Sequence, residues 1–249
     1  MFSPKELALE RGWPGRIDGD RIVQLAAQTL QAFFTGGGGA REHAEYPLAD
    51  CDLRAPVLHP PCVRVFSPFE RGGTPFFSFR STFPVFGPDD EIAYPEGTGE
   101  LDYGLALAAV IGLDGAIGGF TVANDWTARD LARVERDSGF GPSKSRDFAF
   151  SLGPVLVTPD EFAGNRLVAR VNGEERRVAD LRELAHPWPE LVAHAARNTA
   201  LRPGDVLVAA APGGAGPSVR PGDVVELEAE GIGVLRNAVG APRQRPRAT

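Results

Sequence analysis

The sequence has few cysteines, no long apolar run and no excess of basic residues. Its two cysteines, Cys51 and Cys62, flank His59, but a zinc site needs more ligands at closer spacing, so we expect structural thiols in a reducing compartment. No stretch approaches the roughly 20 apolar residues that cross a bilayer, and the first residues lack the apolar block of a secretory signal. These absences predict a cytoplasmic protein with no membrane association.

The charge balance is acidic, with 33 acidic residues against 26 lysines and arginines and a net charge of −7. An acidic chain without a basic stripe is poorly suited to nucleic acid, so we expect no nucleic-acid partner. The one basic stretch, 243–247, lies in a tail rich in proline and arginine, and we predict that 241–249 is flexible. With 249 residues, 43% of them hydrophobic, the chain can bury a globular core.

Local patterns near the N-terminus predict a small α+β domain over 1–55. Residues 16–23 alternate around Asp18-Gly19, which is typical of a β-hairpin. Residues 22–34 then carry apolar residues at helical spacing, which predicts a helix that ends at a run of glycines. A proline-rich stretch over 53–61 is typical of an extended linker, so we place a second domain over 56–240.

Patterns in the second domain predict many short strands and few helices. Asn172-Gly173 between two alternating segments indicates a tight hairpin. The pentapeptide Arg-Pro-Gly-Asp-Val occurs over 202–206 and again over 220–224, each time as a turn before a strand. Residues 181–200 carry helical spacing. The expected fold class is therefore α+β and β-rich.

The densest set of functional side chains lies between positions 120 and 161. It includes a carboxylate, an indole, a guanidinium and an ammonium, from Asp125, Trp126, Arg129 and Lys144. Such groups at the ends of elements can converge on a small ligand. Taken one at a time, charged side chains of this kind more often form a solvated surface. The whole string is therefore more informative than its members.

That string resembles the core signature of the fumarylacetoacetate hydrolase superfamily. The superfamily pattern N-D-x-[ST]-A-R-D is matched by 124–130, G-x-x-K-S-x-D by 141–147, and L-G-P-x-[LV]-V-T by 152–158. The resemblance implies a mixed β-roll or β-sandwich fold, a homodimer, and a small anionic metabolite, a 2-oxo or enol carboxylate, as substrate. Members hydrolyse a carbon–carbon bond of such acids, decarboxylate them or isomerise them.

The resemblance also implies roles for individual residues. Lys144 and Arg129 match cationic positions and are the candidate catalytic residues, and Asp125 matches a ligand of Mg²⁺ or Mn²⁺. Arg80 lies where the strand pattern P-x-F-F-x-K usually ends in lysine, and its planar guanidinium suits a carboxylate. The residues expected to bind substrate are Trp126, Arg80, Asn124 and Thr127.

The chain departs from the superfamily pattern at three places. The pattern L-D-Y-E-x-E, whose two glutamates share one face of a strand and bind metal, has Gly104 and Ala106 here. The lid pattern with a histidine and a glutamate has no histidine over 67–73, and a threonine that meets the substrate carboxylate is replaced by Ala211. We therefore expect no cofactor, with Mg²⁺ or Mn²⁺ bound only weakly through Asp125.

Two functions remain open on the sequence. In the first, an altered enzyme binds a small 2-oxo or enol acid through Lys144, Arg129 and Arg80 and works without Mg²⁺. In the second, a non-catalytic homologue binds a small anion or partners an active relative. The retained cations favour the first function, and the lost carboxylates favour the second. Turnover that survives a chelator distinguishes an altered enzyme from an inert homologue.

Overall fold

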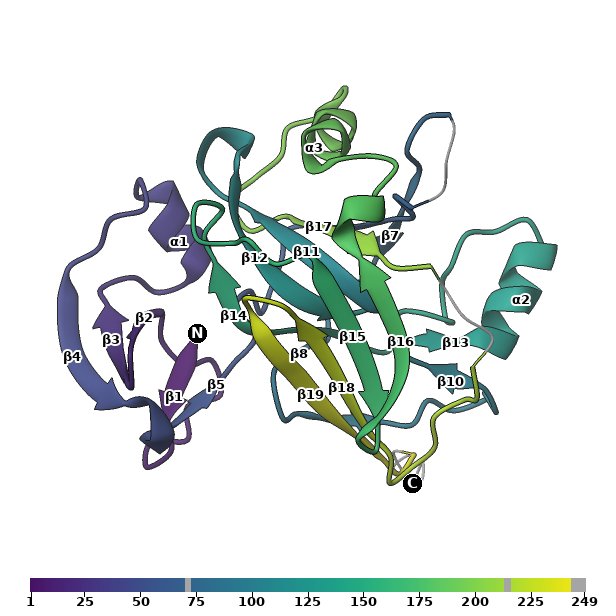
Figure 1. The fold of residues 1–249 in the computed structure, drawn as a ribbon, viewed down its shortest axis with the longest axis horizontal. Helices are drawn as coiled ribbons and strands as arrows, with labels where there is room; N and C mark the ends of the chain where they lie inside the picture. The colour runs from purple at the N-terminus through teal and green to yellow at the C-terminus, as the bar shows by residue number, and fades with distance from the viewer. Residues whose placement is uncertain (70–72, 213–215, 243–249) are drawn as a thin grey trace, which may run out of the picture.

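Two β-sheets packed face to face form most of the computed structural model, which describes residues 1–69, 73–212 and 216–242 (Figure 1). The larger sheet has seven strands in the order β7-β6-β17-β11-β12-β14-β8. The smaller has five strands in the order β16-β15-β18-β19-β9. Along the chain, the larger sheet comprises β6 (Val63–Phe66), β7 (Phe77–Arg80), β8 (Val85–Phe86), β11 (Leu105–Ile111), β12 (Ile117–Asn124), β14 (Phe150–Val157) and β17 (Val206–Ala210). The smaller sheet comprises β9 (Glu91–Ala93), β15 (Arg166–Val171), β16 (Glu174–Asp180), β18 (Val224–Ala229) and β19 (Gly233–Gly240).

The central strand β11 is buried on both faces because side chains alternate along it. Leu105 and Leu107 belong to the core between the two sheets, where they join residues such as Leu227 of the smaller sheet. Ala106 faces the opposite way and joins a second core that includes Phe34 from the N-terminal segment. The larger sheet is therefore covered on one face by the smaller sheet and partly on the other by the N-terminal residues.

The larger sheet is strongly curled. Its two edge strands, β7 and β8, are consecutive in the sequence and are joined only by residues 81–84. Such a link spans at most about 18 Å, at roughly 3.5 Å per residue. A flat sheet of this size would separate its edges by about 29 Å, at about 4.8 Å per strand spacing. The two edges must therefore approach each other, which brings the end of β7 close to the end of β12.

Two helices of 9 residues each, α2 and α3, lie outside the two sheets. Helix α2 (Arg129–Asp137) lies at the periphery and buries none of its residues, beside the short antiparallel pair β10 (Leu101–Asp102) and β13 (Thr127–Ala128) (Figure 1). Helix α3 (Trp188–Ala196) packs Leu191 against Phe66 and Leu207 of the larger sheet. This helix is shorter than the one predicted over 181–200. The first residues of that range, Leu181–Glu183, form a single 3₁₀ turn instead. No helix in the described part of the chain is both long and apolar enough to cross a membrane.

The N-terminal segment has small sheets of its own. They contain β1 (Phe2–Pro4) paired with β5 (Cys51–Leu53), and β2 (Gly15–Asp18), β3 (Arg21–Leu25) and β4 (Glu42–Pro47), with helix α1 (Leu30–Thr35) between β3 and β4. The predicted hairpin over 16–23 is confirmed, with Asp18 opposite Arg21. The domain bounds 1–55 and 56–240 remain a prediction, and of the tail 241–249 only 241–242 lie within the described residues.

The helix predicted over 22–34 is wrong in its first half. Ile22 and Val23 are buried in β3, which pairs with β2 on one side and β4 on the other. The helix begins only at Leu30, where the side chain of Thr29 accepts a hydrogen bond from the backbone of Ala32. Burial between two neighbouring strands outweighs the helical spacing of the apolar residues.

Turn predictions in the core are confirmed. Asn172 and Gly173 adopt positive φ values of 53° and 79° and connect β15 to β16, as the two-residue hairpin requires. The turns over 202–206 and 220–224 lead into β17 and β18. In each, the aspartate carboxylate accepts a hydrogen bond from the backbone N–H of the arginine that opens the turn. Cys51 and Cys62 are free thiols.

Candidate active site

Asp125 directly follows β12 and is held there by its neighbours. Its backbone N–H donates to the carbonyl of Gly104 at 3.1 Å, and its own carbonyl accepts from the Thr127 hydroxyl at 3.1 Å. The Asn124 side-chain oxygen accepts from the backbone of Gly104 at 2.8 Å. These bonds fix the strand end, so the Asp125 carboxylate has a defined direction into the curled sheet.

Two guanidinium groups converge on that carboxylate. Arg80, the last residue of β7, donates from Nε to one Asp125 oxygen at 2.6 Å and from Nη2 to the other at 2.8 Å. Arg146 donates from Nη1 to the second oxygen at 2.9 Å. The side chains of Arg80 and Asp125 are 2% and 5% exposed, whereas that of Arg146 is 30% exposed. We call these three residues the Asp125 cluster.

Arg146 is the member of this cluster that the sequence did not single out. It occupies the variable position of the G-x-x-K-S-x-D pattern, so a motif comparison passes over it. One signal was available, because Gly104 and Ala106 remove two negative charges while Arg80 and Arg146 supply two guanidiniums. Burial, opposed by Asp125, lowers the pKa of the Arg146 guanidinium below its ordinary value.

Glu135 of α2 fixes the segment that carries Arg146. Its carboxylate accepts hydrogen bonds from the backbone and hydroxyl of Ser143, at 2.9 and 2.8 Å, and from those of Ser145, at 3.0 and 2.5 Å. Burial raises the pKa of Glu135, but the hydrogen bonds from Ser145 and Ser143 outweigh it and lower this pKa to about 2. We call these three residues the Glu135 cluster. Its ionised carboxylate positions the residue next to Ser145 in sequence, Arg146.

The Asp125 cluster does not fit a divalent cation. Both carboxylate oxygens already accept hydrogen bonds from guanidiniums, whose positive charge repels a metal ion. A Cβ built on Gly104 would lie 2.6 Å from the Asp125 carbonyl oxygen, so a glutamate at that position needs a backbone shift. Ala106 is fully buried between Ala123 and Ala210. Within the described ranges, no group of three histidine, cysteine, aspartate or glutamate residues could hold a metal.

Arg129 forms a second cluster, apart from Asp125. Its Nη1 lies 3.6 Å from Asp102 and donates to the carbonyl of Gly216 at 2.9 Å, and its Nη2 donates to the Ser218 hydroxyl at 2.8 Å. Burial raises the pKa of Asp102, and the positive charge of Arg129 opposes this. The guanidinium therefore ties the start of α2 to β10 and to 216–218.

Lys144 lies on the exposed segment after α2. Its ammonium pairs with Asp147 at 2.7 Å, its side chain is 80% exposed, and it makes no ion pair with Asp125. Trp126 points into the core instead, with no exposed surface, and its indole N–H donates to the Ser151 hydroxyl at 3.0 Å. The structure thus brings Arg80 to Asp125 but leaves Lys144 and Trp126 outside this cluster.

The residues predicted to bind substrate have structural contacts. Asn124 and Thr127 hydrogen-bond to the backbone around Asp125, as given above, and Asn124 is buried. Their contact with a ligand remains a prediction. The lid segment 67–73 includes 70–72, and the loop around Ala211 includes 213–215, both of which lie outside the described residues.

Comparisons with known proteins identify the family of this chain. The family described as fumarylacetoacetate (FAA) hydrolase C-terminal matches residues 62–240, which include both large sheets and the Asp125 cluster. The chain belongs to the fumarylacetoacetate hydrolase family. The β-rich fold with few helices, expected from the sequence, is confirmed as that of this family.

Several relatives of this fumarylacetoacetate hydrolase family member carry names of isomerising enzymes. The human protein named oxaloacetate tautomerase FAHD2B, mitochondrial, is 32% identical over 66% of this chain and 58% of its own length. Oxaloacetate tautomerase YisK of Bacillus subtilis is 29% identical over 90% of this chain and 84% of its own. The crystal structure of 5-carboxymethyl-2-hydroxymuconate delta-isomerase from Mycobacterium smegmatis is 28% identical and superposes with a TM-score of 0.77, over 92% of this chain and 94% of its own. The chain thus spans less than two thirds of the human protein.

Proposed function

We propose that this family member is an enzyme that isomerises a small 2-oxo or enol carboxylate without a bound divalent cation. One observation carries the proposal: guanidiniums occupy both oxygens of Asp125, the carboxylate expected to ligate metal. Substrate would be a small anionic metabolite, and the enzyme would be a cytoplasmic homodimer. Neither nucleic acid nor a membrane has a part in this proposal.

The chemistry requires stabilisation of a developing enolate. In a keto–enol interconversion, a proton leaves the carbon next to the carbonyl, the carbon–carbon double bond forms, and the carbonyl oxygen takes up a proton, so no atom is gained or lost. A guanidinium can hold the neighbouring carboxylate and stabilise negative charge on the enolate oxygen. The Asp125 cluster carries one net positive charge, because Arg80 and Arg146 together outweigh Asp125. An anionic ligand is therefore favoured there.

Isomerisation is the reaction class that these residues support best. It needs proton transfer alone, whereas hydrolysis of a carbon–carbon bond also needs an activated water. The names of the relatives, oxaloacetate tautomerase and delta-isomerase, point to the same class. Lys144, in the segment after α2, and Arg129, the first residue of α2, remain the candidate catalytic residues in this proposal.

Turnover in the presence of a chelator tests this proposal. The purified protein is treated with EDTA and mixed with oxaloacetate, and the loss of enol absorbance in the ultraviolet is followed. We expect enzyme-dependent turnover whose rate does not change with EDTA or with added Mg²⁺. Turnover that is abolished by EDTA and restored by Mg²⁺ would show a metal enzyme. Absence of turnover with every 2-oxo acid tried, together with retained anion binding, would favour the non-catalytic homologue.

A further inference from the structure

The two arginines of the Asp125 cluster differ in the donors that they leave unused. Arg80 uses Nε and Nη2 on Asp125, and its Nη1 donates to the Ser78 hydroxyl at 2.8 Å and to the Phe79 carbonyl at 3.0 Å. A guanidinium has five N–H donors, so Arg80 retains a single one. Its nearly complete burial and its contacts make it the residue that neutralises and orients Asp125.

Arg146 retains most of its donors. Only Nη1 has a partner among the described residues, the Asp125 carboxylate, and Nε is buried without one. Nε and Nη2 form the same two-donor edge with which Arg80 holds Asp125. Such an edge matches the two oxygens of a carboxylate. Because 30% of the Arg146 side chain is exposed, a ligand can approach it from solvent, whereas the side chain of Arg80 is only 2% exposed.

We infer that Arg146 binds the carboxylate of the ligand through guanidinium donors that have no partner among the described residues, while Asp125, itself fixed by Arg80, holds Arg146 in place. The inference rests on the proposed function for the class of ligand, a 2-oxo or enol carboxylate. It assigns the specificity for a carboxylate to a residue at the variable position of the motif. Arg146 is thus a binding residue, and Asp125 and Arg80 are positioning residues. The Asp125 carboxylate holds a cationic side chain that binds the ligand, where a metal ligand would hold a metal ion.

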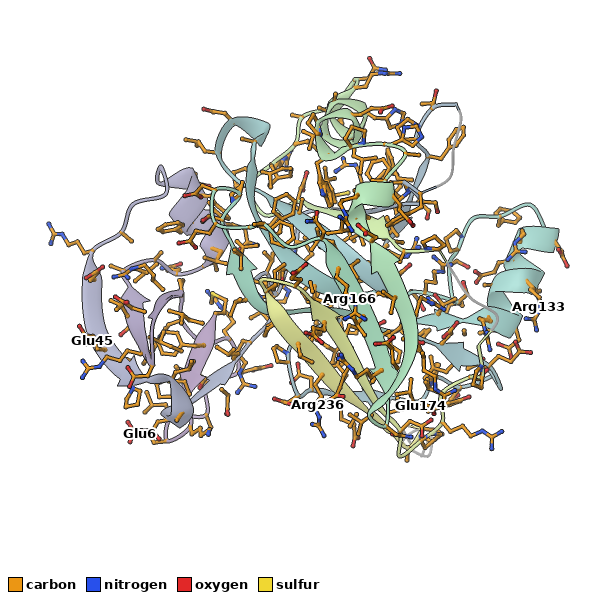
Figure 2. The ribbon with its side chains drawn as sticks, in the orientation of Figure 1. Glu6, Glu45, Arg133, Arg166, Glu174 and Arg236 are labelled. Atoms are coloured by element: carbon orange, nitrogen blue, oxygen red, sulfur yellow. The ribbon has the colours of Figure 1, made fainter. Side chains whose placement is uncertain are left out.

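Arg146→Gln is a clean variant for testing this assignment. It removes the guanidinium but leaves Asp125 paired with Arg80 through two hydrogen bonds, so no buried charge loses its counterion. Arg146→Lys retains the positive charge but lacks the two-donor edge. Arg236→Gln is the matched control, since Arg236, on β19 of the smaller sheet (Figure 2), also pairs with one aspartate, Asp89.

The test is calorimetric titration with oxalate, in EDTA, of the full chain and these three variants. We expect wild type and Arg236→Gln to bind oxalate with similar affinity, Arg146→Gln to lose at least tenfold, and Arg146→Lys to lie between them. Unchanged affinity in Arg146→Gln would overturn the assignment, and so would full affinity in Arg146→Lys. The midpoint of urea unfolding of each variant shows that the protein is folded.

Turnover by the same samples separates this inference from the proposed function. If wild type converts oxaloacetate while Arg146→Gln still binds oxalate normally, the proposed function stands and the assignment of Arg146 is wrong. If wild type shows no turnover but binds oxalate in an Arg146-dependent way, the assignment stands and the isomerase proposal is wrong. Oxalate binding by wild type only after Mg²⁺ is added would overturn both.

Discussion

The carboxylates of Asp125 and Glu135 both accept several hydrogen bonds, but from donors of different charge. Asp125 is buried and accepts from two guanidiniums, whereas Glu135 accepts from neutral backbone N–H groups and serine hydroxyls. The first arrangement balances charges that are costly to bury. The second arrangement fixes the segment around Ser143 and Ser145, and its hydrogen bonds lower the pKa of Glu135 without a cation. Asp125 thus offsets part of the positive charge of the two guanidiniums, and Glu135 supports the geometry of the segment that carries Arg146.

The largest expected effect comes from removing the negative charge of the Asp125 cluster. Asp125→Asn leaves the buried guanidinium of Arg80 without its counterion, and we expect a loss of about 3–5 kcal/mol in the free energy of unfolding. Urea denaturation measures it. Asp89→Asn is the control, because Asp89 pairs with Arg236 at the surface and should leave the unfolding midpoint unchanged. Equal losses of stability in Asp125→Asn and Asp89→Asn would contradict the expected difference between a buried and an exposed aspartate.

Gly104→Ala comes next in size. The added Cβ would meet the Asp125 carbonyl oxygen at 2.6 Å, and relief of such a contact typically costs about 1–3 kcal/mol. The matched control is Gly141→Ala, where no atom lies within 4 Å of the added Cβ, so it should be at least as stable as wild type.

The double variant Gly104→Glu/Ala106→Glu restores the glutamates of the family pattern and tests the same contact in another way. We expect it to gain no Mg²⁺ binding by calorimetry, because a side chain at position 104 displaces the backbone at Asp125 and both Asp125 carboxylate oxygens already accept hydrogen bonds from guanidiniums. Tight Mg²⁺ binding by this variant would show that the site accepts a metal once its ligands return.

Glu135→Gln should have a smaller effect that depends on pH. The folded pKa of Glu135 is about 2, below its ordinary value of 4.5, so the folded state binds this proton less readily than the unfolded state. The contribution of Glu135 is present above pH 4.5 and is lost as the pH falls towards 2. We expect the variant to be less stable by about 1 kcal/mol at pH 7, after allowance for solvent screening.

Comparison with wild type at each pH isolates this contribution from that of other carboxylates. Urea unfolding of both proteins between pH 7 and pH 3 should show a stability difference that narrows as the pH falls. A difference that stays constant over this range would contradict the assigned pKa. Oxalate binding by Glu135→Gln at pH 7 should weaken without being lost, since Arg146 is retained but less well positioned.

The smallest effect is expected for Arg133→Gln. Arg133 lies on α2 (Figure 2) and makes two hydrogen bonds to Glu100, and the two side chains are 53% and 39% exposed. Exposed ion pairs contribute little to stability, so the unfolding midpoint and the oxalate affinity should both stay at the wild-type values. A clear loss of oxalate affinity would mean that α2 contributes its surface charges to the site.

Local chemistry in the sequence predicts much of the fold. The Asn172-Gly173 turn and the repeated pentapeptide turns depend on residues adjacent in sequence, and both are present in the structure. The helix expected from Ile22 onward is not, because the pairing of β3 with β4 involves residues some twenty positions away. The spacing of apolar residues within one segment does not indicate which distant strand will pair with it.

The candidate site was only partly predictable for a similar reason. Motif positions identified Asp125 and Arg80, but their contact depends on the curl of the larger sheet, which brings residues 45 positions apart within 2.6 Å. Arg146 was missed because motif patterns leave its position free. Lys144 matches its motif, yet the structure directs its ammonium towards Asp147.

The position of Trp126 makes the site observable by optical spectroscopy. The indole is fully buried, directly follows Asp125 in the chain and is fixed by its hydrogen bond to Ser151. The chain has two other tryptophans, Trp13 and Trp188. With both replaced by phenylalanine, the tryptophan fluorescence would come from Trp126 alone, and burial would shield this indole from aqueous quenchers. Rearrangement of the neighbouring carboxylate would then change the colour and lifetime of that emission, without any attached dye.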